Sequence, residues 1–352
     1  INNNMLTFNE MNTFGKKGIG NESTYNSGFA LSTYIANEYG SGALSDIMGE
    51  LSSPLQFSIN KAIFNVIGRS GDDIYLDFKN SIEAKYNTLV NPIKVMPVQG
   101  TRLQSEGTTN IHPKWHPNGR SYAYLSNKGN DYFGQTSLYF HDIAAGEDKK
   151  VKSGVSSAPT WHPNGELIYY SRKPKFPNKN GSKFYDIYSY DLESEEEQRL
   201  TFDLRAFNPV FIEHDSSIAY LATYDGGQDI YMFDLRSKNS KKITDFKDRP
   251  MISHLSYDKD QKKLYFDITK NHYRDIYSID IKNENIDHLY NSPTYDERNL
   301  TAQSGGKRIH SQDKSGIYNL YMSSLSDSAS GYITNVTGGA FMPDMSKEGK
   351  VL

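Results

Sequence analysis

The pattern of apolar positions divides the chain into two parts with different periodicity. In residues 20–90, apolar side chains recur every three or four positions, which predicts a series of helices. The first helical run comprises Tyr25, Phe29, Ile35 and Tyr39, and Gly40 follows as a stop signal. Further helices are predicted around residues 44–51, 59–67 and 74–86, and residues 91–97 are rich in helix breakers and predict a connector.

After about residue 100 the pattern changes to short alternating runs that are rich in tyrosine and separated by turns. An Ile/Leu-Tyr pair recurs in these runs at tyrosine spacings of 49, 43, 46 and 44 residues. The tyrosines of the five pairs are Tyr139, Tyr188, Tyr231, Tyr277 and Tyr321. A period in the forties, with several short strands in each unit, is typical of a β-propeller blade.

Each repeat also carries turn signals. A Trp-His-Pro-Asn-Gly sequence precedes the first two pairs, ending at Gly119 and Gly165, and predicts a tight hairpin between the first two strands of a blade. Aspartates follow four of the pairs at a fixed offset, and we interpret them as caps that accept hydrogen bonds from nearby backbone amides. They are Asp142, Asp191, Asp234 and Asp280.

Counting the units gives the expected architecture, which is mainly β. Five complete units are present, a sixth begins around residues 341–349, and residues 102–104 resemble the fourth strand of a blade. We therefore predict a small helical segment in residues 1–98 and a six-bladed propeller in residues 99–352, with the last blade incomplete. Because the sequence opens at Ile1 without an initiator methionine and stops at Val351-Leu352 within a predicted strand, we expect the chain to be a segment of a longer polypeptide.

These repeats resemble the TolB-like propeller family, whose usual hairpin is Ser-Pro-Asp-Gly. The matching sequences are 116–119, 162–165 and 346–349, and the approach to the last of them, residues 335–344, is also similar. The resemblance covers residues 100–352 and is specific for fold rather than function. It implies an extracytoplasmic location, in the bacterial periplasm, at the outer membrane or secreted.

The helical part resembles the C-terminal end of a gluzincin-type metallopeptidase domain. The resemblance lies in Tyr25 to Phe29, Tyr34-Ile35 and Tyr39-Gly40. In that family a His-Glu-x-x-His helix and a glutamate ligand precede this region, but the present sequence contains no such motif and its first histidine is His112. The resemblance implies that zinc, if the parent protein binds it, is held upstream, so we expect no catalytic residue, metal or cofactor in this chain.

Composition narrows the classes of partner. Lys and Arg number 39 against 42 Asp and Glu, a net charge of −3, which disfavours a nucleic-acid partner. There is no cysteine, and no apolar run is long enough for a transmembrane helix. We therefore expect a protein or peptide partner, which could belong to the cell envelope.

Two sets of residues are candidates for partner binding. An acid and an arginine precede the first strand of three successive blades: Asp203 with Arg205, Asp248 with Arg249, and Glu297 with Arg298. Loops that enter first strands surround one mouth of a propeller channel, so these arginines would favour an acidic peptide. His112 and His254 lie near first strands, which line the channel. The alternative for each acid–arginine pair is a local, solvated ion pair.

Three functions remain open at this point. The first is a recognition or docking propeller in a secreted or periplasmic peptidase-like protein. The second is a non-catalytic scaffold of the cell envelope. The third is a propeller hydrolase, which would need three or more acidic side chains converging at one channel mouth.

Overall fold

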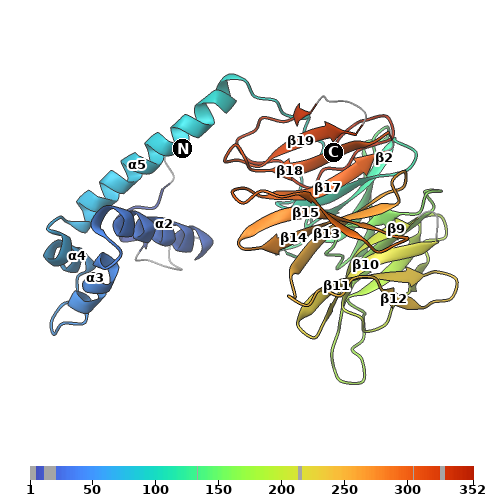
Figure 1. The fold of residues 1–352 in the computed structure, drawn as a ribbon, viewed down its shortest axis with the longest axis horizontal. Coiled ribbons are helices and arrows are strands. Elements are labelled where there is room, and N and C mark those ends of the chain that lie inside the picture. The colour runs from blue at the N-terminus through green and yellow to red at the C-terminus, as the bar shows by residue number, and fades with distance from the viewer. Residues whose placement is uncertain (1–4, 12–20, 133, 213–215, 304, 326–329) are drawn as a thin grey trace. The chain divides into compact units, whose positions relative to one another are not determined.

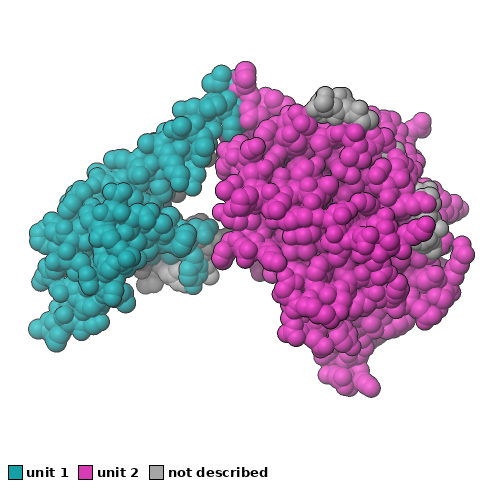
Figure 2. Space-filling model, viewed as in Figure 1, with its two compact units in different colours: residues 1–95 teal, residues 96–352 magenta. Residues whose placement is uncertain are grey.

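The computed structural model describes residues 5–11, 21–132, 134–212, 216–303, 305–325 and 330–352. It contains two compact units, residues 1–95 and residues 96–352 (Figure 2). The sequence predicts this boundary at residue 98, three residues after the end of the first unit at Val95. Val98 pairs with Asn335 in an isolated antiparallel bridge, so this end of the predicted connector belongs to the second unit.

The first unit is helical, as the periodicity predicts. Its helices are α1 (Phe8–Met11), α2 (Asn21–Tyr39), α3 (Ala43–Leu51), α4 (Ile59–Ile67) and α5 (Gly71–Val95). Ser58 caps α4 by accepting a hydrogen bond from the Lys61 amide, and Gly68 ends it in the left-handed conformation. The core contains Leu31, Ile35, Ile63, Ile74 and Phe78.

Two details of the helical prediction are wrong. Tyr25 and Phe29 are 68% and 76% exposed, because α2 turns Leu31 and Ile35 toward the core instead. Helix α5 also continues through Pro92 to Val95 rather than ending at Asn91. Proline costs a helix one backbone hydrogen bond, and here that loss falls in the last turns of a 25-residue helix.

Among its described residues, the second unit contains five antiparallel sheets of four strands, each in sequence order. Figure 1 shows the strands of this unit as arrows. We call the sheets blades 1 to 5. Blade 1 is β1 (Asn110–Trp115), β2 (Ser121–Ser126), β3 (Ser137–Asp142) and β4 (Glu147–Ser153); blade 2 is β5 (Thr160–Trp161), β6 (Leu167–Arg172), β7 (Asp186–Asp191) and β8 (Glu197–Arg199); blade 3 is β9 (Ala206–Ile212), β10 (Ser217–Tyr224), β11 (Gly227–Asp234) and β12 (Ser240–Lys242). Blade 4 is β13 (Met251–Asp258), β14 (Lys263–Lys270), β15 (Tyr273–Asp280) and β16 (Ile286–Tyr290); blade 5 is β17 (Glu297–Gln303), β18 (Lys307–Gln312), β19 (Asn319–Ser324) and β20 (Gly331–Tyr332).

The turn chemistry follows the sequence motifs. The Gly119 and Gly165 amides each donate to the carbonyl of the histidine three residues earlier, and both glycines have positive φ. Each repeated aspartate that follows an Ile/Leu-Tyr pair accepts hydrogen bonds from the amides two and three residues ahead. The structure confirms this capping role at Asp142, Asp191, Asp234 and Asp280.

Residues 344–352 form a short hairpin after blade 5, which we call the closing hairpin. Met345 and Val351 pair across it, and Gly349 turns the chain with positive φ. Met345 and Val351 pack against Ile309 and Leu320 of blade 5, while Leu352 packs against the Tyr122 cluster of blade 1. The hairpin therefore contacts both blade 5 and blade 1.

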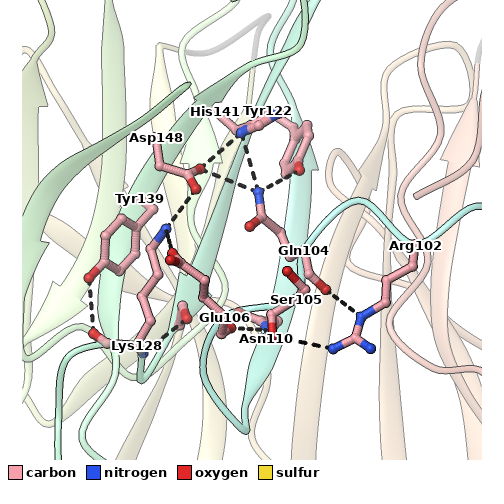
Figure 3. A network of polar contacts seen from close by, with 11 residues as sticks. Arg102, Gln104, Ser105, Glu106, Asn110, Tyr122, Lys128, Tyr139, His141 and Asp148 are labelled. Atoms are coloured by element: carbon pink, nitrogen blue, oxygen red, sulfur yellow. Dashed lines mark hydrogen bonds and ion pairs between the residues drawn. The ribbon is translucent and has the colours of Figure 1, made fainter. Parts of the chain in front are cut away.

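The prediction of a strand at residues 102–104 is wrong. This segment lies against side chains of blade 1, where the Gln104 amide nitrogen is 3.1 Å from the Tyr122 hydroxyl and 3.2 Å from His141 Nδ1 (Figure 3). A fourth strand needs the edge of a third strand beside it, and these residues meet side chains of β2, β3 and β4 instead.

Asp186 provides a test of the turn chemistry because it is fully buried. It accepts hydrogen bonds from Arg199, from the Thr201 hydroxyl and from the Asp203 and Leu204 amides. We predict that Asp186→Ala lowers the free energy of unfolding by about 3 kcal/mol, because these donors lose their acceptor. The matched change Asp234→Ala, at a solvated cap, should cost less. Urea-induced unfolding measures both variants, and equal losses would contradict the explanation.

Candidate functional site at the propeller channel

The first strands of blades 1, 3, 4 and 5 share a bulge next to the channel. When the repeats are aligned on Trp115, the third position before it is occupied in turn by His112, Ala158, Asn208, His254, Asn299 and Met342. Four of these residues have positive φ, between 51° and 58°: His112, Asn208, Asn299 and Met342. The strand register shifts beside this position in blades 1, 3, 4 and 5. Bulges re-aim side chains and concentrate next to functional sites.

The bulge position lines one end of the channel, which we call the entry mouth. Its cavity is about 380 Å³ in volume. Five of the six aligned residues line it, the exception being Ala158, and the remaining lining residues are Ser156, Ser157, Tyr185, Phe207, Ser253 and Arg274. The structure thus brings His112 and His254, predicted separately from the sequence, into one cavity.

Both histidines are held in the neutral form at pH 7. Burial, together with the nearby positive charge of Lys114, lowers the pKa of His254 to about 3 and that of His112 to about 4. His254 Nε2 lies 3.0 Å from the Leu300 carbonyl, so this nitrogen carries the proton and donates.

The entry mouth offers hydrogen-bond donors and no carboxylate among its described lining residues. Arg274 supplies the positive charge, and the buried Ser253 hydroxyl has no hydrogen-bond partner within the described part of the chain. Behind the lining, the backbone N–H of Asn299 donates to both carboxylate oxygens of the buried Asp267, at 3.2 and 3.0 Å. Burial raises the pKa of Asp267 to about 7. This arrangement suits a ligand that brings acceptors.

A separate cavity of about 290 Å³, which we call the inner channel, shares Asn208 with the entry mouth. Two carboxylates are among its described lining residues, Asp258 and Asp344. Asp258 accepts from the Asp260 and Gln261 amides in its own turn. Asp344 bonds Lys114 Nζ at 2.8 Å and the Trp115 amide at 2.7 Å. The lining described here thus falls short of the three converging acids that a propeller hydrolase would need.

In the described structure, the acid and the arginine of each predicted pair do not form an ion pair with each other. Asp203 pairs with Arg199 at 3.5 Å and Asp248 with Lys270 at 3.2 Å, while Glu297 is buried near His310. The arginine side chains make other contacts. The Arg205 guanidinium lies 4.4 Å from the centroid of the Phe184 ring, and the Arg298 guanidinium lies 3.9 Å from the centroid of the Tyr318 ring. The Arg249 side chain is exposed.

The arginines nevertheless lie where the sequence places them, on segments that lead into the entry mouth. Arg205 directly precedes β9, Arg249 is two residues before β13, and Arg298 is the second residue of β17. Their role in binding stays a prediction. Arg274, Asn208, Asn299 and Ser253 were missed from the sequence, although aligning the repeats on the aromatic residue of the first strand, which is Phe211 in blade 3, would have found Asn208.

Within the described ranges, no group of three or more histidine, aspartate or glutamate side chains is placed to hold a metal ion. None of the described helices is long and apolar enough to cross a membrane.

The chain is similar in sequence to curated TolB proteins over short stretches. No family model matches the chain. The Tol-Pal system protein TolB of Ruthia magnifica subsp. Calyptogena magnifica is 35% identical over 97 residues, which is 26% of this chain and 20% of that protein. The chain spans a fifth or less of the curated relatives it matches.

Solved structures agree on the fold. TolB from Acinetobacter baumannii superposes with a TM-score of 0.54 at 18% identity, covering 69% of this chain and 59% of that one. A putative TolB from Agrobacterium tumefaciens gives 0.56 at 18% identity, covering 69% and 88%. The propeller is TolB-like. The upstream metallopeptidase remains a prediction.

The entry mouth of this TolB-like propeller makes stability depend on pH. The unfolded chain takes up a proton on His254 near pH 6.5, whereas the folded chain does so only near pH 3, so acid favours unfolding. We predict that the stability difference between the parent chain and His254→Gln shrinks as pH falls below 6.5. The slope should reach about 1.4 kcal/mol per pH unit.

Asp267 has the opposite effect on the pH dependence of stability, and it is present in both the parent chain and His254→Gln. Subtracting the unfolding free energy of the variant from that of the parent chain therefore removes its contribution. Urea unfolding at intervals between pH 7 and pH 4 measures the difference. A difference that does not vary with pH would contradict the neutral, buried state of His254.

Proposed function

We propose that residues 96–352 are a protein-recognition propeller whose entry mouth binds a carboxylate-bearing or acidic segment of a partner protein. The observation that carries this proposal is the lining of the mouth, which gathers donors from several first strands and includes no carboxylate in the described residues. Arg205, Arg249 and Arg298 on the entering segments add positive charge at the same end of the blades. A guanidinium binds a carboxylate with two parallel hydrogen bonds.

The propeller belongs, in this proposal, to an extracytoplasmic protein, in the periplasm, at the outer membrane or secreted. The similarity to the Tol-Pal system protein TolB supports that location. Two parents fit the propeller: a peptidase-like protein that uses it to dock substrates, and a non-catalytic envelope scaffold. A His-Glu-x-x-His motif encoded upstream in the gene, with zinc bound to the purified parent protein, would support the peptidase-like parent. Absence of this motif would support the envelope scaffold.

A fluorescent peptide rich in glutamate tests the binding proposal. We predict that Arg205→Ala with Arg249→Ala weakens its binding to the chain by about tenfold, because two charge-assisted contacts are lost. The affinity should also fall as salt rises. Fluorescence anisotropy measures both effects.

The matched control removes two exposed cations from outer strands, Lys149 and Lys241. This control pair, each changed to alanine, should bind the peptide as the parent chain does. Equal weakening in both double variants would reduce the effect to net charge and overturn the site. An Arg298→Ala variant then asks whether the stacked guanidinium contributes as well.

We also propose that the ring has six positions, with the closing hairpin as the inner half of the sixth blade. Three observations support this. The hairpin packs on blade 5 on one side and on blade 1 on the other. Residues 102–106 lie on the same face of blade 1 as Leu352. Met342 also occupies the bulge position seen in the first strands.

The Asp344 contacts hold this sixth position to blade 1. We predict that Asp344→Ala lowers the free energy of unfolding by about 2 kcal/mol, because Lys114 and the Trp115 amide lose a half-buried acceptor. Lys114→Met should cost less, since the Trp115 amide still donates to Asp344. Urea unfolding compares the variants, and a neutral Asp344→Ala would contradict the closing role.

A further inference from the structure

A second cavity lies away from the channel, among residues of blades 4 and 5. Its volume is about 400 Å³. Four tyrosines line it, Tyr290, Tyr295, Tyr321 and Tyr332, together with three buried polar side chains, Glu297, His310 and Gln312, and with Lys314 and Ser315. None of these residues lines the entry mouth or the inner channel. The cavity is therefore a separate feature of the propeller.

The cavity exists because one repeat position departs from the pattern. The residue of the second strand that pairs with the marker tyrosine is aromatic and large in the other four blades, as Tyr124, Tyr170, Tyr220 and Phe266. Blade 5 has His310 there, opposite Tyr321. The apolar cluster between blades 4 and 5 is correspondingly small, with Tyr265, Ile276 and Leu300 as its buried members.

Two of the polar side chains in the cavity, Glu297 and His310, form no side-chain hydrogen bond within the described residues. Glu297 is 5% exposed, and its nearest ionic neighbour, His310 Nε2, is 3.9 Å away, too far for a hydrogen bond. His310 is 1% exposed, and neither of its ring nitrogens has a hydrogen-bond partner in the described structure. A buried carboxylate without a donor or a cation is unfavourable. Burial accordingly raises the pKa of Glu297 to about 7.

The aromatic walls are held in place by their own contacts. The Tyr290 hydroxyl lies 3.0 Å from the Ser323 hydroxyl, and the Tyr321 hydroxyl lies 3.0 Å from that of Ser330. The Tyr321 and Tyr332 rings meet edge to face at 88°, with their centroids 5.5 Å apart. The His310 ring lies 4.7 Å from that of Tyr290. Fixed rings around a cavity reduce the entropy that a ligand must lose on binding.

We propose that this cavity binds a small organic cation of the alkylammonium class, with its charge facing Glu297 and its methyl groups on the tyrosine rings. Aromatic faces attract cations through their quadrupole, and an alkylammonium group also gains from contact with apolar ring surface. Lys314 reaches the rim, where its Nζ is 5.7 Å from the centroid of Tyr295, so a side-chain cation already approaches this surface. A metal ion fits less well, because no cluster of three metal ligands occurs among the described residues.

Choline and its neutral isostere 3,3-dimethylbutan-1-ol are the probes. Isothermal titration calorimetry on the full chain should show choline binding with a dissociation constant of about 1 mM or tighter. The neutral isostere should bind at least about tenfold more weakly, because it has the same shape without the charge. Equal binding of the two, or no choline binding up to about 50 mM, would overturn the proposal.

Variants locate the site. Glu297→Gln keeps the shape of the carboxylate and removes its charge, and should weaken choline binding by about tenfold. Tyr332 is at the rim and is 43% exposed, so Tyr332→Leu tests the cage even if a change at the buried glutamate prevents folding. Tyr332→Phe is the matched control that keeps the ring and should bind choline as the parent chain does.

The remaining outcomes also decide the question. Choline binding that survives both Glu297→Gln and Tyr332→Leu would place the ligand elsewhere and overturn the site. The acidic-peptide affinity of the entry mouth should be unchanged in Tyr332→Leu, whose residue lies outside the entry mouth, so failure of the cation site is distinguishable from failure of the proposed function.

Discussion

The second unit depends on the packing of blade against blade. A four-stranded sheet in this unit has two apolar faces, and each must be covered by a neighbour. Among the described residues, apolar clusters join blades 1 and 2, 2 and 3, 3 and 4, and 4 and 5. Two further clusters join the closing hairpin to blade 5 and to blade 1. Without the hairpin, one face of blade 5 and part of one face of blade 1 would lose their cover.

This repeated packing leaves particular positions free to vary, and both candidate sites arise from such variation. At the bulge position, histidine and asparagine occupy first strands of blades 1, 3, 4 and 5, which all shift register there, so the channel mouth acquires polar chemistry without a change in the scaffold. At the second-strand position, one histidine replaces a large aromatic residue and opens a cavity. In each case the fold supplies the geometry, and single side chains supply the chemistry.

The fold could be predicted from the sequence because the repeat is a local signal. The period of the Ile/Leu-Tyr pairs, the two Pro-Asn-Gly turns and the capping aspartates each specify a short segment, and these predictions agree with one another. The errors concern longer-range contacts. Whether residues 102–104 form a strand depends on which edge lies beside them, and the burial of Phe29 depends on which side of α2 meets the other helices.

The candidate sites were less accessible to sequence reasoning for the same reason. His112 and His254 could be placed near first strands, but their meeting in one cavity depends on how the ring brings blades 1 and 4 together. Arg274 and Ser253 carry no motif at all. The acid–arginine pairs looked like ion pairs because they are close in sequence, yet Glu297 and Arg298 are consecutive residues of one strand and point to opposite faces.

Hydrogen–deuterium exchange with and without a bound acidic peptide tests the central claim most directly, because it maps the contact surface without altering the protein. The account predicts slower exchange in the segments that enter the first strands, around residues 205–210, 249–256 and 297–301, with little change in the outer strands. Protection confined to the outer strands, or spread evenly over the propeller, would contradict recognition at the entry mouth.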